Sequence, residues 1–243
     1  MRREIFIESE GLKIHGMFFS PESGSSRVVV FCHGIPLSRP EPNDPGYEGL
    51  AASVCDSGYS ALFFNMRGTG LSQGNFDPLG WYVDLIEVMR VLGDYEKRYL
   101  VGFSFGAMLS IRYAALHRDV SGVASFASPF TLREIFPPGQ ISRFIDSARE
   151  IGIIRDSNFP PSIDWFLERF ESMDLEKYLP LVKIPLLVVH GEEDELVPIE
   201  HAKRIFDLAG GPKAIEILPG GTHRLRRDKR VTGILLSWLH SLE

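Results

Sequence analysis

Three residues that together could carry out nucleophilic acyl transfer lie at separate points of the sequence: Ser104, Asp194 and His223. Ser104 is the centre of the segment Gly102–Gly106 (GFSFG), which matches the G-x-S-x-G pattern of a nucleophilic serine on a sharp turn. A serine hydroxyl is a poor nucleophile until a base removes its proton, and the base must itself be oriented. A histidine and a carboxylate supply these functions, and they follow here in the chain order Ser, Asp, His.

The same five letters would also fit a glycine-rich turn with an incidental serine, and a lone Asp or His is most often a turn or surface residue. The position of Ser104 favours the nucleophile, because an apolar strand predicted over 99–103 runs directly into a helix predicted over 107–116. Glycine on both sides of the serine would remove collisions with that strand and helix. We expect the backbone of Ser104 itself to be strained.

The rest of the chain alternates predicted strands and helices, which is typical of a mostly parallel sheet with helices on both faces. Asp194 and His223 each follow a predicted strand, so all three residues should lie at the carboxyl edge of the sheet, where such sheets bind ligands. Short apolar runs predict buried strands over 27–32, 59–65 and 185–189, after an alternating N-terminal pair over 5–7 and 12–19. Further strands are predicted over 120–127 and 213–218. Further helices are predicted over 47–56, 81–95 and 231–242.

The alternation stops between residues 129 and 181, where two amphipathic helices are predicted and no strand. Their apolar faces consist of Ile141, Phe144, Ile145 and Ala148 in the first, and of Ile163, Phe166, Leu167 and Phe170 in the second, with Ser162 as N-cap. We therefore predict that residues 1–128 and 182–243 form one α/β core, and that residues 129–181 are a helical cap inserted into it.

Cleavage through a serine also needs N–H donors for the oxyanion that forms on the substrate. The expected donors are the backbone amides of Phe105, directly after the serine, and of Ile35, directly after His33-Gly34. We expect the His33 imidazole to hold its own loop in place, and the Phe105 side chain to be free to vary. Residues 35–46 contain four prolines and are expected to form an irregular loop. The remaining histidines, at 15, 117, 190, 201 and 240, show no partner pattern and are assigned no chemistry.

Composition narrows the class of protein. A chain of 243 residues fits one α/β domain with an insertion, and a net charge of -6 argues against nucleic acid or an anionic membrane as partner. Two cysteines form neither a disulfide framework nor a metal cluster, so we expect a cytoplasmic protein that needs no metal or organic cofactor. The sequence has no signal peptide pattern and no membrane span. A small-molecule acyl substrate is the expected partner, and a homodimer is left open.

On five segments the chain resembles the α/β-hydrolase fold family, closest to its serine esterase, lipase and acyl-aminopeptidase-like branch. The resemblance implies an eight-stranded, mostly parallel sheet with a lid between strands six and seven. Serine rather than aspartate at position 104 argues against the dehalogenase and epoxide-hydrolase branches, and Ile35-Pro36 departs from the glycine-rich loop of some esterases. The five segments are His33-Gly34, Asn65 to Ser72, Gly102 to Gly106, His190 to Pro198 and Gly220 to His223.

The expected function is a serine hydrolase that cleaves carboxylic esters of small or medium acyl groups through an acyl-enzyme. An acyl thioesterase or a small peptidase or amidase would use the same three residues, and a non-catalytic binding module on this fold is a third alternative. Basic residues over 224–230 are read as a solvated surface rather than an anion site. Aromatic residues of the predicted cap either line an acyl pocket or only pack the cap onto the core: Phe136, Phe144, Trp165 and Phe166.

Overall fold

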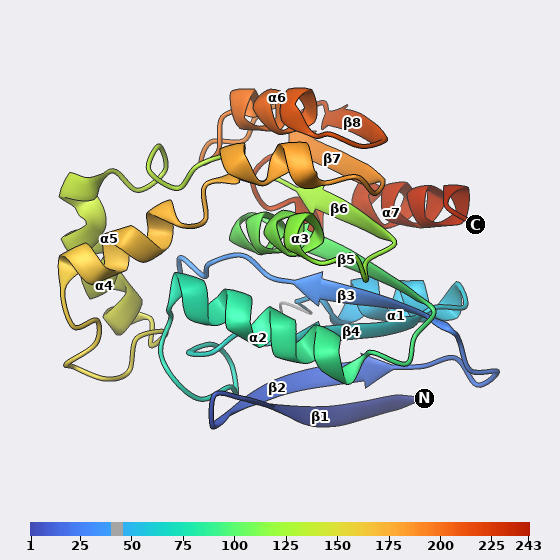
Figure 1. Cartoon of the computed structure of the whole chain (residues 1–243), viewed down its shortest axis with the longest axis horizontal. Helices are drawn as coiled ribbons and strands as arrows, with labels where there is room; N and C mark the ends of the chain where they lie inside the picture. Colours follow the sequence, from blue (N-terminus) through green and yellow to red (C-terminus); the bar gives the residue numbers. More distant parts are fainter. Residues whose placement is uncertain (40–45) are drawn as a thin grey trace.

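The computed structural model describes residues 1–39 and 46–243, which fold around one eight-stranded sheet (Figure 1). The strand order is β1-β2-β4-β3-β5-β6-β7-β8; β2 runs antiparallel to β1 and β4, and the other neighbours are parallel. The predicted mostly parallel sheet of eight strands is thus confirmed. The strands are β1 (Arg2–Ser9), β2 (Leu12–Phe19), β3 (Arg27–Cys32), β4 (Ser60–Phe64), β5 (Lys97–Phe103), β6 (Gly122–Phe126), β7 (Leu186–Gly191) and β8 (Lys213–Leu218).

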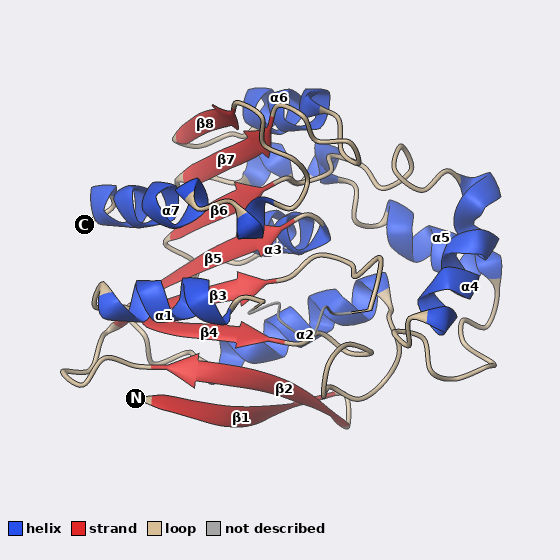
Figure 2. Cartoon of the chain, turned by 180° about the vertical axis from the view of Figure 1, so that it is seen from behind, coloured by secondary structure: helices blue, strands red, loops and turns tan. Residues whose placement is uncertain are grey.

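Helices cover both faces of the sheet: α1 and α7 lie on one face and α2, α3 and α6 on the other (Figures 1 and 2). Over the described residues, no helix combines the length and the apolar character that crossing a membrane requires. The helices are α1 (Glu48–Asp56), α2 (Pro78–Val91), α3 (Phe105–Leu116), α4 (Ile141–Glu150), α5 (Ile163–Glu171), α6 (Ile199–Leu208) and α7 (Arg230–Ser241), with short 3₁₀ turns at Pro138–Gln140, Leu175–Lys177, Leu179–Leu181 and Leu225–Arg227.

The central strands are apolar on both faces because each face packs against helices. In β3, Val28 and Val30 point into the core under α2 and α3, while Val29 and Phe31 point into the core under α1 and α7. All four side chains are at most 1% exposed. The alternation follows from the two-residue period of a strand, and it explains why residues 28–32 of β3 are all apolar.

Two helices differ from the sequence prediction. Helix α6 was not predicted. Helix α2 begins at Pro78, three residues before the predicted start at 81, and ends at Val91, four residues before the predicted end at 95. The early start has a local cause: Asp77 has an extended backbone and its carboxylate accepts a hydrogen bond from the amide of Leu79 at 3.1 Å, with proline in the first turn. Of the predicted loop over 35–46, residues 40–45 lie outside the described residues, and 35–39 are irregular as expected.

Residues 129–181 connect β6 to β7 and carry α4 and α5 beyond the end of the sheet (Figure 2). Ser162 caps α5 as predicted, because its hydroxyl accepts a hydrogen bond from the amide of Trp165 at 3.1 Å. The predicted face of α4 is fully buried, whereas in α5 Ile163 remains 46% exposed. The guanidinium of Arg155 ties this segment to the loop after β4, since it donates to the carbonyls of Ser72 at 2.8 Å and of Gly68 at 3.2 Å.

Candidate active site

Ser104 lies on a sharp turn between β5 and α3 with φ 52° and ψ −123°. This left-handed φ is strained for a residue with a side chain, as predicted. The flanking glycines have the expected reason: a Cβ on Gly102 would lie 2.3 Å from the Cα of Ala107, and a Cβ on Gly106 would lie 2.2 Å from the carbonyl oxygen of Cys32. The turn therefore closes only with glycine on both sides of the serine.

The structure brings Ser104, His223 and Asp194 together, although they are far apart in the sequence. The Ser104 Oγ lies 3.1 Å from His223 Nε2, and His223 Nδ1 lies 2.9 Å from Asp194 Oδ2. An ionised carboxylate only accepts hydrogen bonds, so Nδ1 carries the imidazole proton and Nε2 is free to accept the serine proton. Asp194 is fully buried and His223 is 16% exposed. This is the geometry of a nucleophile, a base and an orienting acid.

The carboxylate of Asp194 is held in place by backbone amides as well as by His223. Its Oδ1 accepts hydrogen bonds from the amides of Leu196 at 3.0 Å and Val197 at 2.8 Å. Burial favours the neutral acid, but the hydrogen bonds from His223 and from the two amides outweigh burial and lower the pKa of Asp194. Asp194 is therefore a carboxylate at neutral pH, ready to stabilise a positively charged His223.

His190 supports this carboxylate and was missed by the sequence analysis. Its Nε2 lies 2.8 Å from the carbonyl oxygen of Val197 and 3.3 Å from Asp194 Oδ2. The carbonyl of Val197 must accept, so Nε2 carries the proton of a neutral ring, and burial lowers the pKa of His190. Val197, whose amide donates to Asp194, is thus held through its carbonyl oxygen by His190. The only sequence signal was the position of this histidine, four residues before Asp194.

The two expected oxyanion donors lie beside Ser104. Among the described residues, the amides of Ile35 and Phe105 donate to no other protein atom, so both N–H groups are available to a bound oxyanion. The loop after β3 approaches the serine closely: a Cβ on Gly34 would lie 2.9 Å from the Cβ of Ser104. Glycine at this position allows the Ile35 amide to come near the nucleophile.

His33 fixes the loop that carries the Ile35 amide, as predicted. The amide of Met66 donates to His33 Nε2 at 3.0 Å, so Nε2 has no proton and Nδ1–H donates to the carbonyl of Gly34 at 2.8 Å. A proton on Nε2 would oppose the Met66 amide. Burial outweighs the stabilising bond to Gly34 and lowers the pKa of His33 to about 4. The ring is therefore neutral and joins two loops of the site.

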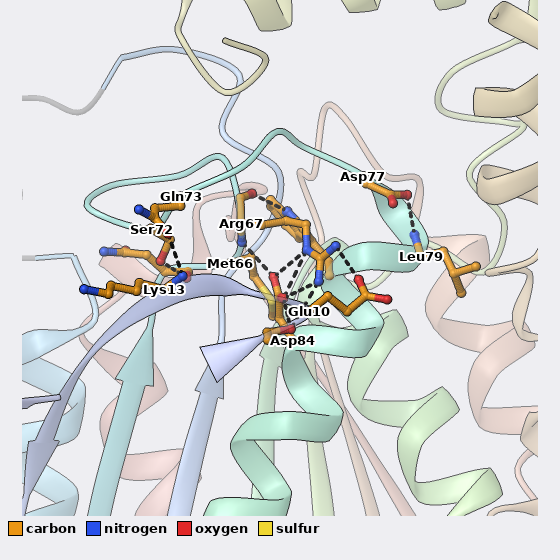
Figure 3. Close-up of polar contacts among 12 residues, drawn as sticks. Glu10, Lys13, Met66, Arg67, Ser72, Gln73, Asp77, Leu79 and Asp84 are labelled. Carbon is orange, nitrogen blue, oxygen red and sulfur yellow. Dashed lines mark hydrogen bonds and ion pairs between the residues drawn. The ribbon is translucent and has the colours of Figure 1, made fainter. Parts of the chain in front are cut away.

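The loop after β4 is itself fixed by a buried ion pair (Figure 3). The guanidinium of Arg67 donates to Asp84 Oδ1 at 2.7 Å and to Glu10 at 2.9 Å, and its backbone amide donates to Asp84 Oδ2 at 2.8 Å. Trp81 Nε1 donates to the Arg67 carbonyl at 2.9 Å. The neighbouring Met66, which bonds to His33, is thus held by the turn after β1, by α2 and by the ion pair together.

A small pocket, open to solvent, includes Ser104 in its lining. Apart from this serine, every lining residue is apolar, which suits a hydrocarbon group better than a charged one. The lining comes from the loops after β3, β5, β6 and β7, all at the carboxyl edge of the sheet. It consists of Ile35, Leu37, Ser104, Phe105, Pro129, Leu132, Ile135, Phe136, Leu196 and Val197.

Of the four aromatic residues proposed as pocket candidates, only Phe136 belongs to the lining of the pocket at Ser104. Phe144 and Phe166 pack against Phe76 instead, with ring centroids 5.7 and 5.8 Å apart, and so attach the helical segment to the core. Trp165 lies under the guanidinium of Arg169 at 3.7 Å. The helical period predicts that these rings are on one face, but not what that face covers.

The expectation that the Phe105 side chain is free to vary is wrong. The ring is 1% exposed, packs 5.7 Å from the ring of Trp81 and also lines the pocket. Its position at the start of α3 turns it toward the aromatic core.

Among the described residues, no group of three or more His, Cys, Asp or Glu side chains is arranged to hold a metal ion.

Comparison with known families agrees with this fold. The family model described as alpha/beta hydrolase fold matches residues 27–150, which is more than half of the chain. The chain belongs to the α/β-hydrolase fold family. A second family model, described as serine aminopeptidase S33, matches residues 157–230 of this α/β-hydrolase.

Relatives of this α/β-hydrolase cover nearly its whole length. The AB hydrolase superfamily protein YisY of Bacillus subtilis is 26% identical over 241 residues, covering 84% of this chain and 87% of that protein. The structure of an alpha-beta serine hydrolase homologue from Coxiella burnetii has a TM-score of 0.68 at 25% identity and covers 98% of this chain and 97% of the other. An esterase domain from a Rhodothermus marinus protein has the same fold, with a TM-score of 0.73 at 21% identity and coverage of 98% and 97%.

Proposed function

We propose that this α/β-hydrolase is a carboxylesterase that cleaves esters of small or medium acyl groups through an acyl-enzyme. The observation that carries the proposal is the continuous hydrogen-bonded chain from Ser104 Oγ through both nitrogens of His223 to Asp194. The apolar pocket that includes Ser104 supports an aliphatic or aromatic acyl group as substrate. Esterase-like structural neighbours agree with this class of reaction.

In the proposed reaction, Ser104 Oγ attacks the ester carbonyl carbon while its proton moves to His223 Nε2. The carbonyl oxygen becomes an oxyanion and accepts hydrogen bonds from the amides of Ile35 and Phe105. Collapse of the tetrahedral intermediate breaks the ester C–O bond, and His223 gives its proton to the departing alcohol. A water molecule then repeats the sequence: His223 takes its proton, the carboxylic acid leaves, and the proton returns to Ser104.

We further propose that residues 129–181 act as a cap over this site. Pro129, Leu132, Ile135 and Phe136 all belong to this segment and form one wall of the pocket. The segment therefore contributes directly to the surface that a bound acyl group would contact. Its anchor at Arg155 and its aromatic contacts with Phe76 hold that wall in place.

A peptidase that removes N-terminal residues is the second candidate, because the S33 aminopeptidase model matches residues 157–230. Such an enzyme must bind the ammonium group of its substrate, for which a carboxylate is the usual partner. The pocket at Ser104 has no carboxylate in its described lining, which favours the ester. A panel of nitrophenyl esters, acyl thioesters and aminoacyl nitroanilides separates these activities by their kcat/KM values.

The proposed function is tested by the turnover of p-nitrophenyl butyrate. Ser104→Ala should lower kcat about 10³-fold or more, because the nucleophile is lost and only binding and the oxyanion donors remain. The matched control is Ser125→Ala on the adjacent strand β6. Its hydroxyl is buried and has no hydrogen-bond partner among the described residues, so this variant should keep wild-type turnover. A folded Ser104→Ala variant with near-normal turnover contradicts the proposal.

A further inference from the structure

Phe136 borders two pockets at once. Besides the pocket at Ser104, it lines a second small pocket that is also open to solvent. Among the described residues, Phe136 is the only one that belongs to both linings. The second pocket is lined by Arg133, Phe136, Pro138, Leu167, Phe170 and Glu171.

The Phe136 ring is held in this position from two sides. Its backbone amide donates to the carbonyl of Leu132 at 2.7 Å, which closes a tight turn directly after the wall of the first pocket. Its ring packs against those of Phe144 and Phe170, with centroids 4.9 and 5.8 Å away. These contacts hold the ring at the position where it belongs to both linings.

The second pocket is chemically suited to continue a hydrocarbon chain. Pro138, Leu167 and Phe170 supply apolar surface. Its two charged residues, Arg133 and Glu171, form an ion pair with each other and are 62% and 47% exposed. Because the charges are paired and face solvent, they add no net charge that would select for an anionic or cationic group.

We propose that Phe136 is the end wall of the acyl pocket and makes this enzyme prefer the shorter acyl groups of the proposed range. Removal of the ring joins the pocket at Ser104 to the pocket beneath Leu167 and Phe170, and the joined channel favours longer straight acyl chains. The inference rests on the proposed esterase function, since it assigns the pocket at Ser104 to the acyl group. Phe136 is in this account a specificity-determining residue and not a catalytic one.

The test is the ratio of kcat/KM for p-nitrophenyl octanoate to that for p-nitrophenyl butyrate. Each methylene that moves from water into an apolar pocket is worth about a four-fold factor. Phe136→Ala should therefore raise the ratio about ten-fold or more, even if part of the added chain stays in contact with water. Trp165→Ala is the matched control. It removes an aromatic ring of the same helical segment that lines neither pocket and packs on Phe159 and Arg169, so it should leave the ratio unchanged.

A second variant shows where the longer chain goes. Leu167→Trp in the Phe136→Ala background fills the second pocket and should return the ratio to the wild-type value. An unchanged ratio in Phe136→Ala, or a raised ratio that Leu167→Trp does not reverse, overturns the inference. If Phe136→Ala does not fold, judged by its thermal melt, Phe136→Val takes its place.

Failure of the esterase proposal would look different. In that case no ester is hydrolysed by any variant, and the pocket is tested by binding of octanoate itself. Octanoate should raise the melting temperature of Phe136→Ala more than that of the wild type, because ligand binding stabilises the folded state. Equal shifts in the two proteins overturn the inference even then.

Discussion

The neutral His33 imidazole makes a specific prediction about stability in mild acid. In the folded protein Nε2 accepts the Met66 amide and burial lowers the pKa of His33 to about 4, whereas an exposed histidine titrates near 6.5. Between these two values the unfolded chain binds a proton that the folded protein excludes. The free energy of unfolding therefore falls as the pH drops from about 6.5 toward about 4.

The size of this effect follows from the difference between the two pKa values. At about 1.4 kcal/mol per pKa unit, the difference between about 6.5 and about 4 gives a loss of at most about 3–4 kcal/mol from His33 across that pH range. The value is an upper bound because the ring keeps some contact with solvent. His33→Gln removes the titration, and its side-chain oxygen can still accept the Met66 amide.

Urea unfolding of the wild type and of His33→Gln, followed by tryptophan fluorescence at several pH values from about 7 to about 4.5, measures the effect. The stability difference between the two proteins should shift by about 2–3 kcal/mol in favour of the variant as the pH falls. Burial also lowers the pKa values of His190 and His201, but both are common to the two proteins and cancel in the difference. Parallel pH dependences would refute the assigned tautomer and the buried, neutral state of His33.

Two further substitutions probe the site. Asp194→Asn should lower kcat about 10⁴-fold, because the amide no longer holds His223 in the tautomer that accepts the serine proton. The protein should remain folded. A loss of less than about ten-fold in ester turnover would argue against this role of Asp194. Gly106→Ala should lower stability by about 1–3 kcal/mol and abolish turnover, since its Cβ would lie 2.2 Å from the carbonyl oxygen of Cys32. The control is Gly233→Ala in α7, where no atom lies within 4 Å of the added methyl group. This change should raise the free energy of unfolding by up to about 1 kcal/mol in the same urea assay. Equal effects of Gly106→Ala and Gly233→Ala would contradict the steric argument.

The parts of the fold that were predictable are those in which residue type directly reports the environment. The apolar runs of β3 and β5 can only be buried on both faces, and a five-residue pattern between a strand and a helix leaves little freedom in how the turn is built. Asp194 and His223 followed from the rule that parallel strands end at one edge of the sheet. Residue order along the chain was enough for these inferences.

What was missed depends on contacts between distant segments. Nothing near His190 indicates that its ring reaches the carbonyl of Val197 and the carboxylate of Asp194, because both contacts arise from the course of the loop after β7. Likewise, the helical period places Phe144 and Phe166 on buried faces, yet only the packing against Phe76 shows that they attach the cap rather than line the pocket.

The central claim is that Ser104 is a nucleophile activated by His223, and covalent labelling tests it most directly. A fluorophosphonate probe reacts only with an activated serine, and mass spectrometry of the labelled protein identifies the site. The account predicts one label per chain on Ser104, absent in Ser104→Ala and strongly slowed in His223→Ala. A wild-type protein that stays unlabelled, or carries the label on another serine, would contradict it.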